Sequence, residues 1–168
     1  MNLDMKPTIM TKRPAECSVH ELQTFCELVL SEGQVNPVTL RGYVVGAEIL
    51  AFAYYDDELC AVAAIKNAQL TYRRRIQRKS DNHLLLEEIS REFGYVVVSP
   101  HHRGKRLSGA LADSLLQGDK GMLFATSTTG NKRMHQTLER HRFKRSGKSY
   151  PSTEHPDQEI ILFVRSEL

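Results

Sequence analysis

The stretch from Glu92 to Ser108 carries the residues whose types and spacing could do chemistry. A nearly continuous hydrophobic run over 93–98 predicts a buried strand, which Ser99-Pro100 ends. A basic turn, Arg103-Gly104-Lys105-Arg106, then leads into a helix that we expect to begin at about Gly104. The first amides of a helix lack internal acceptors and lie at the positive end of its dipole. The segment therefore predicts either a phosphate-binding loop or an ordinary turn with a solvated basic surface.

This segment resembles the acyl-CoA motif of the GNAT (Gcn5-related N-acetyltransferase) superfamily, Gln/Arg-x-x-Gly-x-Gly/Ala after a strand that often ends in Val-x-Pro. Here Arg103 matches the first position, Gly104 matches a glycine that many members carry next, and Ser108 is the small residue. Arg106 replaces the central glycine. Its side chain could restrict the approach of the backbone to a pyrophosphate, or it could add a cation to the site.

A second block resembles the family's Asn-x-x-Ala…Glu-Lys-x-Gly-Phe pattern. It comprises Asn131, Met134 and the segment Glu139–Phe143, in which Met134 and Arg142 depart from the usual Ala and Gly. Leu138 stands where many members have a tyrosine that protonates the leaving thiolate. The resemblance therefore implies that this proton donor is absent or comes from elsewhere.

The resemblance implies an N-acyltransferase that moves an acetyl group from acetyl-CoA to a primary amine by direct attack in a ternary complex. It implies that the pantetheine arm hydrogen-bonds the backbone of the fourth family strand, and that the diphosphate lies on the loop. The implied cofactor-binding residues are Val96, Val97, Val98, Arg103, Gly104, Lys105, Arg106, Leu107, Ser108 and Asn131. Asn131 could also simply begin a helix. Since no cysteine maps onto these positions, we expect no covalent intermediate.

Glu92 is the candidate general base. An amine with a pKa near 10.4 is only about one part in 10³ neutral at pH 7, and a positioned base helps by roughly 10²–10⁴. The resemblance implies this role because Glu92 stands where the histone-acetyltransferase branch has its glutamate. The alternatives are a solvated helix-end charge, a structural role such as partner of Arg91, and a proton path relayed by water.

The remaining polar candidates have alternative roles. His101 and His102 could contact phosphate or lie in a solvated loop, and His135 could act as an acid or lie at the surface. The histidines show no metal-ligand spacing, so we expect no metal. The basic runs 73–79 and 140–148 could form a solvated edge or steer an anionic acceptor or the 3′-phosphate. Nucleic-acid binding is disfavoured because few aromatic residues accompany them.

Around these residues the chain alternates helices and strands. Helices are expected from the capping box at Ser18 to Gly33, from Pro37 to Val45, from about Gly104 to Gly118, and after Asn131. Strands are expected at 49–55, 59–65, 93–98, 122–125, from 143, and at 159–165, whereas 72–82 reads as basic and irregular. This order predicts an α/β fold: a mixed, mostly antiparallel sheet of about six to seven strands with helices on both faces.

Composition agrees with one domain over 1–168. The 168 residues include 40% hydrophobic and 26% charged residues, with a net charge of +3, so collagen-like and disordered classes are excluded. Three scattered cysteines favour thiols in a reducing cytoplasm. The sequence has neither a membrane-length apolar run nor a signal peptide, so we expect a cytoplasmic protein without membrane contact.

Two points stay open at this level. The partner is an amine on a small molecule or a protein, and a homodimer through the last strands is compatible with the sequence. The alternative function, motivated by Arg106 and Leu138, is a catalytically inert GNAT-like module that binds acyl-CoA or another anionic ligand.

Overall fold

The computed structural model describes residues 5–33, 35–82 and 86–166. Its strands form one seven-stranded open sheet in the order β1-β2-β3-β4-β5-β7-β6, in which β4 and β5 run parallel and the other recorded pairs run antiparallel. Helices flank the sheet, so the predicted fold class is confirmed. No helix of the described ranges is both long enough and apolar enough to cross a membrane.

The chain divides into two compact units, each described here by itself. Unit 1 comprises Met1–Lys66 and Tyr95–Gln117, and unit 2 comprises Asn67–Gly94 and Gly118–Leu168. Strand β4 (Arg91–Val98) is continuous through the boundary, so its first half belongs to unit 2 and its second half to unit 1. That the chain acts as one domain stays a prediction.

The strands of unit 1 begin with one that the sequence did not predict, β1 (Thr8–Lys12). It pairs antiparallel with β2 (Ile49–Tyr55), which in turn pairs with β3 (Glu58–Asn67) as the predicted hairpin. The hairpin turns at Asp56, whose φ of 50° lies in the left-handed region that short polar residues tolerate.

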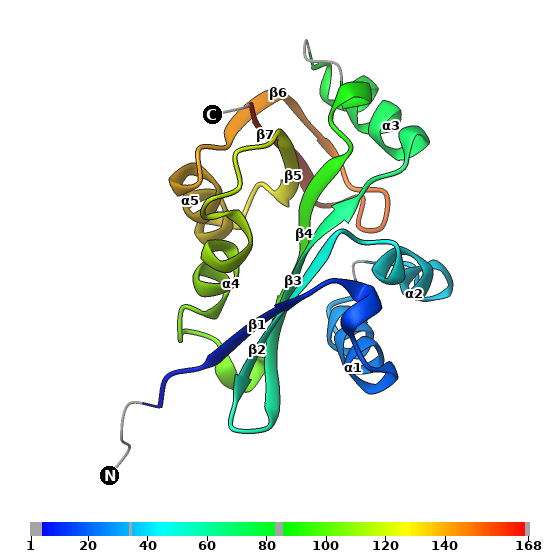
Figure 1. Ribbon diagram of the computed structural model, residues 1–168. Coiled ribbons are helices and arrows are strands. Elements are labelled where there is room, and N and C mark those ends of the chain that lie inside the picture. Colours follow the sequence, from blue (N-terminus) through cyan, green and yellow to red (C-terminus); the bar gives the residue numbers. More distant parts are fainter. Residues whose placement is uncertain (1–4, 34, 83–85, 167–168) are drawn as a thin grey trace. The chain divides into compact units, whose positions relative to one another are not determined.

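The helices of unit 1 cover both faces of these strands (Figure 1). The helices α1 (Val19–Leu30) and α2 (Pro37–Val45) begin at the predicted caps, Ser18 and Asn36, whose side chains accept from backbone amides. They follow the short 3₁₀ turn η1 (Pro14–Glu16). Their apolar side chains pack with those of one sheet face in a cluster that includes Phe25, Val29, Leu40, Phe52 and Val62. Helix α4 (Leu107–Leu116) covers the other face.

In unit 2 the prediction for the basic segment 72–82 is wrong. This segment is not irregular but forms the helix α3 (Leu70–Ser80), followed by the 3₁₀ turn η2 (Leu86–Glu88). The guanidinium of Arg73 is buried and donates to the carbonyls of Ala68, Leu86 and Glu87. An arginine that satisfies three carbonyls behaves as an interior residue, which charge alone does not reveal.

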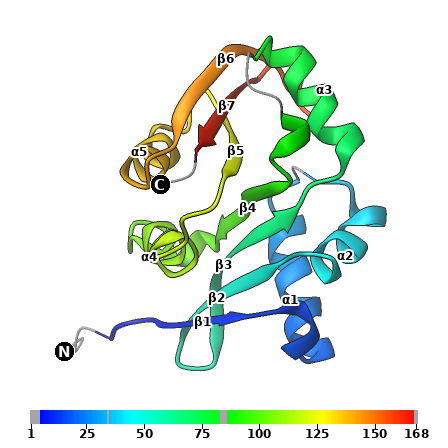
Figure 2. The same ribbon diagram turned by 45° about the horizontal axis from the view of Figure 1, so that its top comes forward.

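The remaining elements of unit 2 form a strand cluster between two helices. Strand β5 (Leu123–Thr128) pairs with β7 (Glu159–Arg165), and β7 pairs with β6 (Lys144–Pro151). Figure 2 shows α3 and α5 (Lys132–Arg140) on opposite sides of β7. The alternation of β7 fits this arrangement, because Leu162 and Val164 pack with Ile76 of α3, whereas Phe163 contacts His135 of α5.

Candidate functional site

The basic loop of unit 1 has an unusual backbone. After β4 ends at Val98, a 3₁₀ turn η3 (Pro100–His102) leads to Gly104 with φ 82° and Arg106 with φ 59° and ψ 27°. Because Arg106 takes the left-handed conformation, α4 begins at Leu107, three residues later than we expected. Glycine takes this conformation without strain, whereas an L-residue with a side chain costs roughly 1–2 kcal/mol there.

The amides of this loop are available to a ligand. Among residues 5–33, 35–82 and 86–166, none accepts a hydrogen bond from the amides of Arg106 through Ser108. The residue at the helix N-cap, Arg106, makes no side-chain capping bond. Several N–H groups therefore meet at the positive end of the α4 dipole, an arrangement that favours phosphate or another anion.

Three residues of this loop are cationic. Arg103, Lys105 and Arg106 are exposed. The guanidinium of Arg103 pairs with Glu32 at 3.0 Å, and the Lys105 ammonium lies 4.6 Å from the centre of the Tyr55 ring. An exposed ion pair of this kind contributes only about 0–1 kcal/mol, so Arg103 can exchange Glu32 for a phosphate at little cost.

Two of the predicted cofactor residues have side chains in the core of unit 1. Leu107 is buried, so it can offer a ligand only its backbone. Val97 is also buried and packs in the cluster with α1 and α2. Val96 and Val98 are half-buried. Just before them, Tyr95 has a left-handed φ of 52°, which breaks the regular geometry of β4.

Glu92 lies in unit 2 and is buried, with 2% of its surface exposed. The sequence alternative that made it a solvated helix-end charge is therefore wrong. The Tyr72 hydroxyl donates to its Oε1 at 3.1 Å. Burial, and next the charge of Glu92, raise the pKa of Tyr72 well above its usual value, and the same two causes raise the pKa of Tyr150. Both phenols thus stay protonated beside a carboxylate that is shielded from bulk water.

Asn131 and His135 lie at the start of α5 in unit 2. The Asn131 Oδ1 accepts from the amide of Met134, so this side chain caps the helix, and a contact with a cofactor stays a prediction. The surface alternative for His135 is wrong, since its ring is buried. Its Nε2 lies 2.9 Å from the Thr128 carbonyl, and an Arg145 nitrogen lies 3.2 Å from its Nδ1. Because the guanidinium can only donate, Nδ1 accepts and Nε2–H donates.

The two histidines before the basic loop differ. His101 is exposed, as a solvated loop predicts, but His102 is buried and the expectation fails for it. Its Nδ1 lies 2.7 Å from the Ser99 Oγ, and its ring stacks on Tyr55 with the centres 5.6 Å apart. The residues around His102 in the sequence could not indicate its burial, because Tyr55 belongs to β2, far away in the chain.

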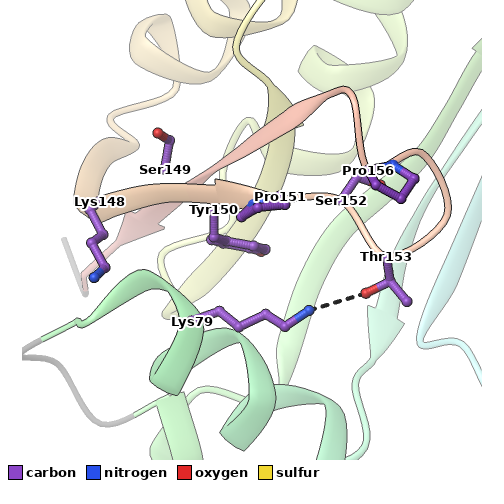
Figure 3. Close-up of a pocket in the computed structure, with 8 residues that line it drawn as sticks. All are labelled: Lys79, Lys148, Ser149, Tyr150, Pro151, Ser152, Thr153 and Pro156. Carbon is purple, nitrogen blue, oxygen red and sulfur yellow. Dashed lines mark hydrogen bonds between the residues drawn. The ribbon is translucent and has the colours of Figure 1, made fainter.

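Unit 2 also has an open cavity of about 580 Å³ that no predicted site residue lines (Figure 3). It lies between α3 and the end of β6, where the Lys79 ammonium donates to the Thr153 hydroxyl at 3.2 Å. The lining residues are Lys79, Lys148, Ser149, Tyr150, Pro151, Ser152, Thr153 and Pro156. One lysine of each basic run, Lys79 and Lys148, thus borders this cavity, whereas Arg73 of the first run lies in the interior.

Comparisons with known proteins show the fold. No protein-family model and no curated protein matches the chain. An acyl-CoA N-acyltransferase from Pseudomonas aeruginosa is similar in structure, with a TM-score of 0.69 and 17% identity over 96% of this chain and 100% of that chain. NAA60 of Arabidopsis thaliana, solved with a bisubstrate analogue, has a TM-score of 0.63 and 13% identity over 94% and 97%.

A third similar structure is yncA of Salmonella typhimurium, a putative acetyltransferase solved with its cofactor acetyl-CoA. Its TM-score is 0.60, and it is 13% identical over 96% of this chain and 94% of its own. The chain thus has the fold of the GNAT acyltransferases over nearly its whole length. At these identities the likeness concerns the fold, and function has to be argued from the residues themselves.

Proposed function

We propose that this protein is an acyl-CoA-dependent N-acetyltransferase that transfers an acetyl group from acetyl-CoA to a primary amine of a small molecule or a protein. The observation that carries the proposal is the group of amides from Arg106 to Ser108 at the start of α4, from which no described residue accepts a hydrogen bond. The GNAT fold supports it, and acetyl-CoA is the cofactor in one structure with that fold.

In this proposal, the loop holds the diphosphate of acetyl-CoA. The amides of Gly104 to Ser108 donate to its oxygens, and the exposed side chains of Arg103, Lys105 and Arg106 neutralise its charge. Leu107 contributes only its amide, because its side chain is buried. When bound, acetyl-CoA supplies a thioester, whose acetyl carbon an amine can attack.

The same strand that leads to the loop carries the proposed chemistry. Backbone amides of Val96 to Val98 are proposed to bind the pantetheine arm and to stabilise the developing oxyanion, a type of donor that contributes about 3–4 kcal/mol where it has been measured. Glu92, on the same strand β4, is proposed to accept the proton of the attacking amine, directly or through water. Tyr72 orients its carboxylate by a hydrogen bond. Leu138 is buried and apolar, so it offers no proton for the thiolate.

Calorimetry with acetyl-CoA and CoA, followed by a thiol-release assay over a panel of amines, tests the proposal. We expect binding of both nucleotides and turnover with at least one amine. Glu92→Gln should keep acetyl-CoA binding and lose roughly 10²–10⁴ in turnover. The matched control is Glu88→Gln, an exposed carboxylate of the same unit, which should leave both quantities unchanged.

Each other outcome contradicts a stated part of the proposal. Absence of acetyl-CoA binding would refute the function altogether. Binding of acetyl-CoA without turnover of any amine would instead favour the inert binding module that Arg106 and Leu138 suggest. Equal turnover in Glu92→Gln and Glu88→Gln would remove the base from Glu92.

A further inference from the structure

Three side chains of types that bind metals meet in unit 1, outside the proposed site. A carboxylate oxygen of Glu58, the Sγ of Cys60 and a ring nitrogen of His102 all lie within 4.8 Å of one another. Cys60 and His102 are buried, whereas the Glu58 carboxylate reaches solvent. The cluster is thus open to solvent on the Glu58 side, through which a small ion can enter.

The fold holds these residues together by backbone contacts. Glu58 and Cys60 lie at the start of β3, where the pairing with β2 is irregular: Ala53 pairs with Ala61 and Tyr54 with Leu59, so Cys60 is the extra residue of a bulge. The amide of Ser99 donates to the carbonyl of Cys60 at 2.8 Å, which fixes the turn η3, and with it His102, against the start of β3. The ligands come from segments far apart in the chain, and the spacing of histidines in the sequence could not have indicated them.

The His102 ring is oriented as a metal ligand would be. The Ser99 Oγ lies 2.7 Å from its Nδ1, and Tyr55 stacks on its face. A partner on one ring nitrogen fixes the direction of the other, which is the usual arrangement around metal-binding histidines. The remaining nitrogen, Nε2, faces the Glu58 carboxylate at 4.0 Å.

We propose that Glu58, Cys60 and His102 bind a zinc ion, with water as the fourth ligand. A thiolate, an imidazole and a carboxylate form a donor set that suits this borderline-soft ion. One thiolate and one carboxylate together cancel its charge. In a tetrahedral zinc site the donor atoms lie about 3.5 Å apart, so a small rotation of the exposed Glu58 side chain closes the site.

Coordination replaces one contact and releases one proton. The Cys60 thiol now donates to the Glu58 carbonyl at 3.1 Å. A buried, protonated thiol is a poor nucleophile, which argues against a covalent role for this cysteine. Zinc binds the thiolate, and the thiol proton leaves to solvent. The ion would join the hairpin of β2 and β3 to the turn before Arg103.

The test is calorimetry of the chelator-treated full chain with Zn²⁺, together with the visible absorption of the Co²⁺-loaded protein. We expect one equivalent of zinc to bind, proton release on binding, and a thiolate-to-cobalt charge-transfer band. Cys60→Ser should abolish the band, whereas Cys26→Ser, the half-buried cysteine of α1, should preserve it. Ser99→Ala should weaken zinc binding by about 10–100-fold.

Glu58→Gln keeps the test decisive if a change at the buried Cys60 impairs folding. Because the Glu58 side chain is exposed, this variant should fold, and it should bind zinc at least tenfold more weakly. Asp57→Asn, the neighbouring exposed carboxylate, is its control and should bind as the wild type does. No zinc binding, or equal binding in Glu58→Gln and Asp57→Asn, would overturn the proposal. None of these results depends on binding of acetyl-CoA.

Discussion

Replacing Arg106 by glycine should stabilise the protein while weakening acetyl-CoA binding. Arg106 has φ 59° and ψ 27°, so its side chain stands in the left-handed region. Relief of that strain gives roughly 1–2 kcal/mol, and the greater freedom of glycine in the unfolded chain takes back about 0.4–1 kcal/mol. The net gain is about 1 kcal/mol, which for a chain of this length raises Tm by about 2–4 °C.

The expected effect of the same change on acetyl-CoA binding has the opposite sign. If Arg106 supplies a cation to the diphosphate, its removal loses one charge-assisted hydrogen bond. For an exposed group we take the lower end of the usual range, about 1.5 kcal/mol, which weakens binding roughly tenfold. The alternative, that the side chain obstructs the diphosphate, predicts tighter binding in Arg106→Gly.

Arg142 provides a matched control for this experiment. It also has a left-handed backbone, with φ 69°, is exposed, and lies in unit 2. Arg142→Gly should raise Tm by a similar amount and leave the Kd for acetyl-CoA unchanged. Thermal unfolding without ligand and calorimetry with acetyl-CoA measure the two quantities. A lower Tm in Arg106→Gly, or a Kd that falls, would refute the reasoning.

Three further predictions concern named contacts. Glu32→Gln frees Arg103 from its ion pair and should tighten acetyl-CoA binding by about 2–5-fold in calorimetry at low salt, with a smaller gain at high salt. Tyr72→Phe removes the hydrogen bond to Glu92 and should lower kcat more than it changes KM; the pH profile of kcat should shift if the hydroxyl tunes this carboxylate, and an unchanged profile would contradict that role. Asp119 has a pKa held below its usual value, first by the hydrogen bond from Arg91, so the stability it contributes is present above about pH 4 and is lost as pH falls further. Asp119→Asn should therefore flatten the fall in Tm below pH 4, and an unchanged acid slope would contradict the prediction.

The two arginines with positive φ show what a family pattern can reveal in a divergent sequence. Arg106 and Arg142 both stand where the resemblance expects glycine, and both keep the backbone conformation that glycine favours. The motif located these two positions in the sequence, and the structure shows that their backbone takes a positive φ. The motif could not predict the helix start at Leu107, because that depends on the conformation of Arg106 itself.

Local signals predicted those elements that rest on local physics. The caps at Ser18 and Asn36 and the hairpin after Tyr55 follow from side-chain hydrogen bonds and turn residues within a few positions. The helix α3 was not predicted because most of its residues are basic and few are apolar. Its Arg73 is buried because backbone carbonyls accept hydrogen bonds from the guanidinium. Tertiary packing, not composition, decides such a segment.

Burial of single polar residues was beyond the sequence for a similar reason. Glu92 lies near the start of a strand, and His135 lies on a helix of mostly polar residues, so neither neighbourhood indicates the interior. Both can be buried because residues of other elements satisfy their hydrogen bonds: Tyr72 donates to Glu92, and the Thr128 carbonyl accepts from His135. The sequence could identify Glu92 as the candidate base, but it could not predict that this residue is buried or that Tyr72 donates to it.

The most direct measurement of the central claim follows individual amides of the ¹⁵N-labelled protein by NMR while CoA is added. If the diphosphate binds the loop, the amide signals of Gly104 to Ser108 should shift and saturate together, at the concentration where calorimetry detects binding. The signals of Gly118 and Gly147, which also have left-handed backbones but lie outside the loop, should stay in place. Saturable binding of CoA that leaves the signals of Gly104 to Ser108 unmoved would contradict the claim.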